Sequence, residues 1–176
     1  MLAAECAWAV LGAEHARIRE LLALVERALD AGDWTDPAPQ AAASLVELIE
    51  RLQAFEETTH RPKGVVLLKL LRGRSAEADQ LLDQLELESA HCDDLLSRSK
   101  AMLKRAGAGE TDAAAGADTL LQEHRRVMHA HLEQEDTLLH SQAALLLTGE
   151  EWAAVASSIS EALRPRKKAP AGASSS

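Results

Sequence analysis

Apolar residues recur with a helical period along most of the chain. Residues 2–31 carry apolar side chains at spacings of three, four and seven, which fall on one stripe of a helix: Trp8, Leu11, Ile18, Leu22 and Val25. The following segment, GDWTDPAPQ, is rich in Gly, Asp and Pro, as loops are. The pattern therefore predicts one long helix over residues 2–31, followed by a loop.

A second helix is predicted to begin near Pro39. Its inward positions carry Leu45, Ile49, Leu52 and Phe55. Pro62 then falls inside the apolar pattern, and a proline at such a place kinks a helix or ends it shortly before. We expect the kink or end near His60, with VVLLKLL able to continue the helix as far as Arg72 before the break RGRS.

Two further long helices and one short helix complete the pattern. One runs from about Ser75 to Arg105 and buries Leu81, Leu85, Leu95 and Met102. The Gly- and Ala-rich stretch GAGETDAAAGA predicts a flexible turn, and another helix runs over about 117–147. Thr148 and Glu151 form a capping box that starts a fifth helix ending near Leu163.

The composition favours an all-α fold. Of the 176 residues, 47% are hydrophobic, mainly Leu and Ala, with one Phe and no Tyr, and such a composition favours helix over sheet. Four long helices with short connections predict an up-down-up-down four-helix bundle with a short C-terminal fifth helix. We expect one domain over residues 1–163 and a disordered basic and Ala/Ser-rich tail over 164–176.

Charge and cysteine content narrow the partners and the location. The formal net charge is −9, which argues against a nucleic-acid partner. Cys6 and Cys92 stand alone without a CxxC motif, so neither a disulfide framework nor a thiolate metal site is predicted, and a reducing cytoplasm fits. Glu5 interrupts the first apolar run and no basic leader precedes it, so we expect no signal peptide. No apolar run reaches the length of about 18 residues that a membrane span needs, and no membrane partner is expected.

Each of the four long helices is predicted to point one histidine toward the core. His15 shares the stripe of the first helix, and His60 lies about 20° from Ile49 on a helical wheel. His91 is four residues from both Leu87 and Leu95, and His131 shares a face with Val127, Met128 and Leu138. Four imidazoles in one core are costly to bury unless their lone pairs are bound, and metal ions bind neutral imidazole well.

Glu135 strengthens the case for a metal site. It lies four residues after His131, so the two side chains are neighbours on one helix face. Nitrogen and oxygen ligands suit iron, manganese or zinc, and the lack of thiolates argues against an iron–sulfur cluster. His124, two turns before His131, is an extra ligand, a proton relay, or a bundle-end or surface residue, with the last favoured. His129 and His140 are predicted to be ordinary solvated residues.

The ordered histidines resemble the bacterial hemerythrin-like, or HHE cation-binding, domain family. AEHARIRELL carries a first-helix histidine, and THRPKGVVLLKLLRGR is similar to the family's HHPKE-type segment. HLEQEDTLLHSQAALLLTGEEW is similar to its HxxxEE segment and its final LTxEEW helix. The resemblance covers about residues 8–163. It implies a four-helix bundle that holds a non-haem di-iron centre, in proteins that bind oxygen, sense oxygen or redox state, handle nitric oxide or respond to iron.

Carried over by position, the resemblance implies metal ligation by His15, His60, His91, His131 and Glu135. The carboxylate of the first HxxxE segment falls on Gly64, and Arg61 replaces the second histidine of the HHPKE form. The family's two carboxylates bridge two irons, so one bridge is missing. Glu56, one turn before His60, is the better substitute and Glu57 the weaker one. We expect a site that binds metal more weakly, binds one metal, or has degenerated.

A ferritin-like di-iron protein is an alternative. Glu57 with His60 and Glu88 with His91 both form the ExxH ligand pair of that class. However, ferritin-like sites use mostly carboxylates, and these two pairs fall on consecutive helices without a long crossover. The alternative also leaves His15 and His131 unexplained.

The type of activity stays open between binding and interaction. No Ser–His–Asp or Cys–His arrangement and no Gly-rich phosphate loop can be argued, and the absence of Tyr excludes a tyrosyl radical. We therefore expect a binding or sensing protein rather than an enzyme, with oxygen or nitric oxide as the small diatomic ligand and no protein partner identified. A metal-free helical bundle that serves as an interaction protein is the second alternative, because of the loss at Gly64.

Overall fold

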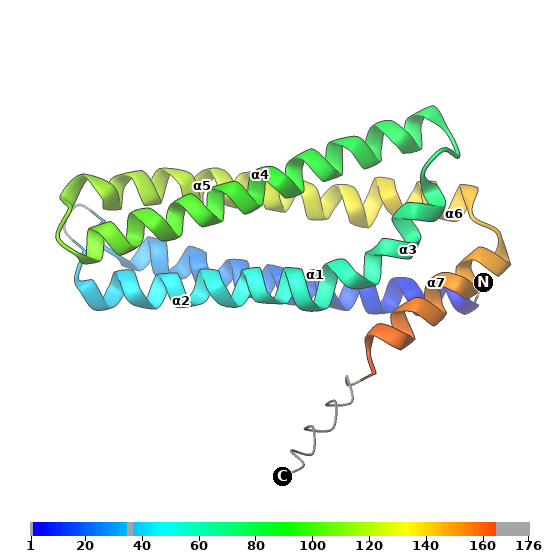
Figure 1. Cartoon of the computed structure of the whole chain (residues 1–176), viewed down its shortest axis with the longest axis horizontal. Coiled ribbons are helices and arrows are strands. Elements are labelled where there is room, and N and C mark those ends of the chain that lie inside the picture. Colours follow the sequence, from blue (N-terminus) through cyan, green and yellow to red (C-terminus); the bar gives the residue numbers. More distant parts are fainter. Residues whose placement is uncertain (1, 35–36, 165–176) are drawn as a thin grey trace, which may run out of the picture.

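The computed structural model describes residues 2–34 and 37–164, and all the regular structure in this part of the chain is helical (Figure 1). The four long helices are α1 (Leu2–Ala31), α2 (Pro39–Phe55), α4 (Ala76–Gly107) and α5 (Thr111–Gln134). They lie side by side, each running opposite to the one before it, which is consistent with the predicted up-down-up-down bundle. The predicted all-α class is confirmed for the described residues.

Three short helices gather at the end of the molecule where the N-terminus lies (Figure 1). These are α3 (Arg61–Leu71), α6 (His140–Leu146) and α7 (Gly149–Ala162). α7 packs against α1 and α3. None of the helices in residues 2–34 and 37–164 has both the length and the hydropathy that crossing a membrane requires.

The second predicted helix bends without breaking. α2 passes into a π-helical turn, η1 (Glu56–His60), and α3 follows directly and leaves the line of α2 (Figure 1). Pro62 lies in the first turn of α3, where a missing backbone N–H costs little. The predicted kink near His60 is therefore present, and the helix continues to Leu71 as VVLLKLL suggested.

The prediction of a flexible turn over residues 107–117 is wrong for most of its length. α5 begins at Thr111, and only residues 108–110 connect it to α4, with Gly109 at a φ of 100°. Small side chains explain the extra helix, because they allow close packing on the neighbouring helices. Gly116 is an example, since a Cβ added there would lie 2.7 Å from the sulfur of Met102.

The predicted helix starts near Ser75 and Thr148 are confirmed. Ser75 caps α4, its side chain accepting a hydrogen bond from the backbone of Ala78 at 3.0 Å. Thr148 and Glu151 form the predicted capping box at the start of α7. The predicted disordered tail falls on residues 164–176, of which 165–176 lie outside the described residues.

The core of the described residues consists of two large apolar clusters along the long axis and a small third one of Ala106, Ala113 and Ala114. The first cluster packs the middle of the long helices, from Ile18 to Leu29 on α1 and from Cys92 to Leu103 on α4. The second cluster packs the N-terminal ends of α1 and α4 against the three short helices. Between the two clusters every long helix or its extension carries polar side chains. We call this set the polar layer: His15, Glu56, His60, Glu88, His131 and Glu135.

Candidate metal centre

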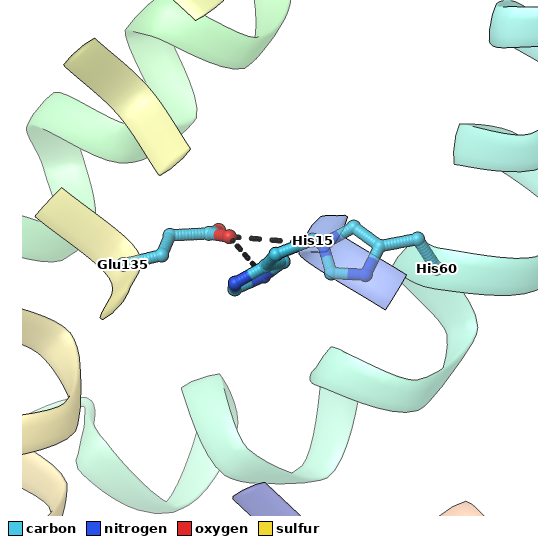
Figure 2. A group of neighbouring side chains, drawn as sticks. All are labelled: His15, His60 and Glu135. Atoms are coloured by element: carbon cyan, nitrogen blue, oxygen red, sulfur yellow. Dashed lines mark ion pairs between the residues drawn. The ribbon is translucent and has the colours of Figure 1, made fainter. Parts of the chain in front are cut away.

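Three side chains of the polar layer converge on one point. His15 comes from the middle of α1, His60 from the end of η1, and Glu135 from the start of a second π-helical turn, η2 (Glu135–Leu139) (Figure 2). One ligand atom from each lies within 4.8 Å of the others. Glu135 Oε2 is 2.9 Å from His15 Nε2 and 3.7 Å from His60 Nε2. Because metal bonds to nitrogen and oxygen are about 2.1 Å long, ligand atoms of one ion lie at such separations.

A third imidazole faces the other oxygen of the same carboxylate. His131 Nε2 lies 3.3 Å from Glu135 Oε1, on the turn before Glu135. Oε2 therefore faces His15 and His60, whereas Oε1 faces His131. This arrangement allows Glu135 either to hold one ion or to bridge two.

Each of the three histidines presents its other ring nitrogen to a second carboxylate. A Nδ1–H that donates to a carboxylate fixes the tautomer and leaves the Nε2 lone pair free for a metal. The contacts are His15 Nδ1 to Asp136 Oδ1 at 2.5 Å, His60 Nδ1 to Glu14 Oε2 at 3.1 Å, and His131 Nδ1 to Glu88 Oε2 at 3.2 Å. With this tautomer all three Nε2 lone pairs point toward Glu135.

These outer carboxylates are themselves held in place by other side chains. Arg19 Nη2 donates to Asp136 at 2.6 Å, and Gln134 Nε2 donates to Glu88 at 3.2 Å. Glu14 receives the ammonium of Lys63, which also donates to the backbone oxygen of Thr59 at 2.9 Å. Lys63 and Glu14 are only 3% and 7% exposed, so this ion pair is part of the interior.

The electrostatics of the metal-free cluster favour cations. Burial would lower the pKa of His60, but its contacts with Glu135 and Glu14 raise that pKa to about 9. Burial would likewise raise the pKa of Glu135, but His131, His15 and His60 lower it well below the ordinary value. Burial raises the pKa of Glu14 while His60 and Lys63 lower it, and the net shift is downward. Glu135 and Glu14 therefore stay ionised and favour the protonated form of His60, and Glu135 and Glu88 likewise raise the pKa of His131.

Glu135 provides a direct indication that a metal ion fits. Its Oε2 is buried and accepts no hydrogen bond, although His15 Nε2 is 2.9 Å away. A buried carboxylate oxygen without a donor is costly. An ion placed among Oε2 and the neighbouring Nε2 atoms would remove that cost, so the residues present fit a metal with nitrogen and oxygen ligands.

The predicted inward position of His91 is wrong. Its side chain is 48% exposed, and it lines an open groove between α4 and α5, with Nε2 3.8 Å from Glu123 Oε1. The prediction used Leu87 as an inward reference, but Leu87 is 72% exposed and lies on the same outer face. On α4 the inward position at the level of the cluster belongs to Glu88, the partner of His131.

The other histidines were predicted with mixed success. His124 was expected at a bundle end or at the surface, but it lies in the middle of α5 (Thr111–Gln134) and is 1% exposed, with a buried Nε2 that has no hydrogen-bond partner. His129 and His140 are exposed, as predicted. The ExxH pairs of the ferritin-like alternative do not assemble either, because Glu57 and His91 both point outward.

Gly64 and Arg61 stay outside the cluster. Gly64 lies in α3, and a Cβ added there would meet no atom within 4 Å. Arg61 reaches outward to Asp93 Oδ1 at 2.6 Å. Its Nε also lies 3.7 Å from Glu56 Oε2. Glu56 itself is only 8% exposed, and burial raises its pKa even though His60 and Arg61 oppose the shift.

Sequence reasoning missed the outer carboxylates and Lys63. Two of them had a signal, since Glu14 precedes His15 and Asp136 follows Glu135 in the chain. A charged residue next to a candidate ligand is usually solvent-facing, yet Glu14 is buried. The ligand assignment as a whole stays a prediction, and the structure brings together His15, His60, His131 and Glu135 from it.

The chain was also compared with known proteins. It matches the hemerythrin HHE cation binding domain over residues 6–143. No curated protein and no solved structure matched it. The matched region holds all three histidines of the cluster together with Glu135, and it spans well over half of the 176 residues. The chain therefore belongs to the hemerythrin HHE cation-binding domain family.

Proposed function

We propose that the protein is a hemerythrin-like up-down-up-down helical bundle that binds non-haem iron in its polar layer. The observation that carries the proposal is the convergence of His15, His60 and His131 on the two oxygens of Glu135. Iron is favoured because imidazole and carboxylate ligands suit it and because the family binds metal cations.

The protein's own residues have distinct roles in this proposal. His15, His60 and His131 bind the metal through Nε2, and Glu135 neutralises part of its charge. Asp136, Glu14 and Glu88 orient the imidazoles through their Nδ1 atoms. The apolar clusters on both sides exclude water from the layer and so strengthen these interactions.

We infer that the bound iron serves binding or sensing rather than catalytic turnover. Iron in such a site supplies a redox-active centre for a small diatomic ligand, oxygen or nitric oxide. Around the cluster the described residues form a histidine-rich, largely buried environment. The role thus proposed is oxygen or nitric oxide binding, redox sensing or iron handling.

A metal-free interaction protein is the second candidate. It is favoured by two departures from the family pattern, glycine at position 64 and the exposed side chain of His91. Such a protein would keep the family fold after losing its metal chemistry.

Iron content decides between the two candidates. The wild-type protein and two variants, Glu135→Gln and Glu133→Gln, would be loaded anaerobically with Fe(II), desalted and assayed for iron per chain. Glu133 is exposed two residues from Glu135, so its variant is a matched control. We expect at least about one iron per chain in the wild type and the control, none in Glu135→Gln, and new near-ultraviolet absorption after exposure to air. Absence of iron in all three, with an unshifted melting curve, would favour the metal-free candidate.

A further inference from the structure

The two π-helical turns of the protein are built on the same plan. Glu56 opens η1 and Glu135 opens η2. Two residues later each turn has a threonine whose hydroxyl donates to a backbone oxygen four residues before it, Thr58 to Ala54 at 2.6 Å and Thr137 to Glu133 at 2.7 Å. Short π-helical turns are rare and occur frequently at functional sites, since the extra residue re-aims the side chains around them. Glu56 is therefore the positional counterpart of Glu135.

Glu56 is buried in the polar layer without a close partner for its charge. It is 8% exposed, and its ion-pair contact with Arg61 is 3.7 Å long, beyond hydrogen-bonding distance. Arg61 meanwhile donates to Asp93 at 2.6 Å. The electrostatic partners of the Glu56 carboxylate include His60, His131 and Glu135, which are the groups of the candidate metal centre.

The charge of the layer leaves room for a cation that Glu56 would bind. The basic side chains around it each serve another carboxylate, since Arg19 pairs with Asp136, Lys63 with Glu14, and Arg61 donates to Asp93. The imidazoles of His15, His60 and His131 turn Nε2 toward Glu135. A buried carboxylate whose neighbouring cations are engaged elsewhere is costly, and a metal ion shared with Glu135 would remove that cost.

We propose that Glu56 is the second carboxylate ligand of the metal centre and takes over the position that Gly64 has lost. This inference rests on the proposed function. The family pattern supplies the second carboxylate four residues after the histidine, whereas here it comes from four residues before His60. The π-helical turn η1 makes the exchange possible, because it holds Glu56 and His60 at its two ends, with Glu56 only 8% exposed and His60 in the cluster with His15 and Glu135.

Metal titration of matched variants tests the proposal. The variants are Glu56→Gln and the control Glu57→Gln, which changes the exposed neighbour in the same turn. Apo-proteins would be titrated anaerobically with Fe(II) and, separately, with Co(II), whose visible bands report the number and type of ligands. We expect the wild type and Glu57→Gln to bind alike. Glu56→Gln should bind roughly tenfold to a hundredfold more weakly, with changed Co(II) bands and a smaller rise in melting temperature on loading.

Each outcome of the titration has one meaning. Equal affinity and equal Co(II) bands in Glu56→Gln and Glu57→Gln would overturn the role of Glu56 and leave the proposed function standing. Absence of metal binding in the wild type would overturn both. If Glu56→Gln fails to fold, Glu56→Asp keeps the charge on a shorter side chain, and wild-type affinity and bands in that variant would contradict the proposal.

Discussion

The segments α2–η1–α3 and α5–η2–α6 share a backbone plan but order their ligands differently. In the first segment Glu56 begins the π-helical turn and His60 ends it. In the second segment His131 lies on the α-helix before the turn and Glu135 begins it. If Glu56 binds metal as proposed, the comparison teaches that a ligand lost at one helical position is replaceable from the opposite side of a histidine when an extra residue in the turn re-aims the chain.

The two segments also differ in the ion pair that each forms with α1 next to the candidate metal centre. Lys63 of the first segment pairs with Glu14 in the interior, behind His60. Asp136 of the second segment contacts His15 and pairs with Arg19 near the surface. Asp136 and Arg19 are 35% and 40% exposed, so water screens their charges. The first segment therefore depends more strongly on a complete ion pair.

The largest effect is expected from breaking that buried pair. Lys63→Met leaves the Glu14 carboxylate buried without its cation, which should lower the free energy of unfolding of the apo-protein by roughly 3–5 kcal/mol. Urea denaturation at pH 7 would measure the loss. Lys69→Met changes an exposed lysine of the same helix and should cost almost nothing. Adding Glu14→Gln to Lys63→Met should restore much of the stability, because it removes the unpaired charge. A loss below about 1 kcal/mol in Lys63→Met alone would contradict the role of the pair.

The next largest effect is a pH dependence of stability that we expect from the interior of the second segment and not from that of the first. Seven residues before His131 the second segment buries His124, whereas the first has the half-buried Gln53 seven residues before His60. Burial lowers the pKa of His124 to about 4. Between pH 6.5 and 4 the unfolded chain therefore binds a proton that the folded protein does not, and stability falls as the pH falls.

A variant isolates this contribution from the other titrating groups. Between pH 7 and pH 5 the wild type should lose about 2 kcal/mol more stability than His124→Leu, which has no group to protonate at that position. Urea denaturation of both proteins at the two pH values gives the difference. Parallel losses in the two proteins would show that His124 takes up its proton equally in both states.

A smaller effect separates His131 from His91, the two histidines that sequence reasoning treated as equals. His131→Ala should weaken Fe(II) binding at least about tenfold, because it removes the imidazole that faces Glu135 Oε1. His91→Ala should leave the affinity within about twofold, since its side chain is 48% exposed and faces Glu123. Anaerobic Fe(II) titration checks both variants, and equal losses would show that His91 moves inward when metal binds.

The sequence predicted local structure well, but it predicted less well whether a polar or charged side chain points into the core or toward solvent. Helix starts at Ser75 and Thr148 were predictable because capping depends on neighbours in the chain. The direction of the His91 side chain was not predictable in this way. The exposed Leu87 was counted as part of the buried face of the helix, so the predicted buried face was rotated by part of a turn.

Buried charge was still harder to predict. Lys63 and Glu14 lie 49 residues apart, and each is buried only because the other is there. The π-helical turns are also invisible in a helical wheel that assumes a constant angle per residue. Both features depend on packing between helices, so sequence reasoning found His15, His60, His131 and Glu135 but not their supports.

The smallest effect comes from restoring a side chain at Gly64, four residues after His60, where the second segment has Glu135 four residues after His131. A Cβ there meets no atom within 4 Å, so Gly64→Ala and Gly64→Glu should both fold. Each replaces a helical glycine, which should raise the free energy of unfolding of the apo-protein by roughly 0.5–1 kcal/mol. In the Glu56→Gln background, Gly64→Glu should in addition restore part of the lost affinity for Fe(II), and Gly64→Ala should not. If the two variants bind iron alike, a carboxylate at position 64 does not reach the metal, and Glu56 on the other side of His60 would then be the only route by which the first segment supplies one.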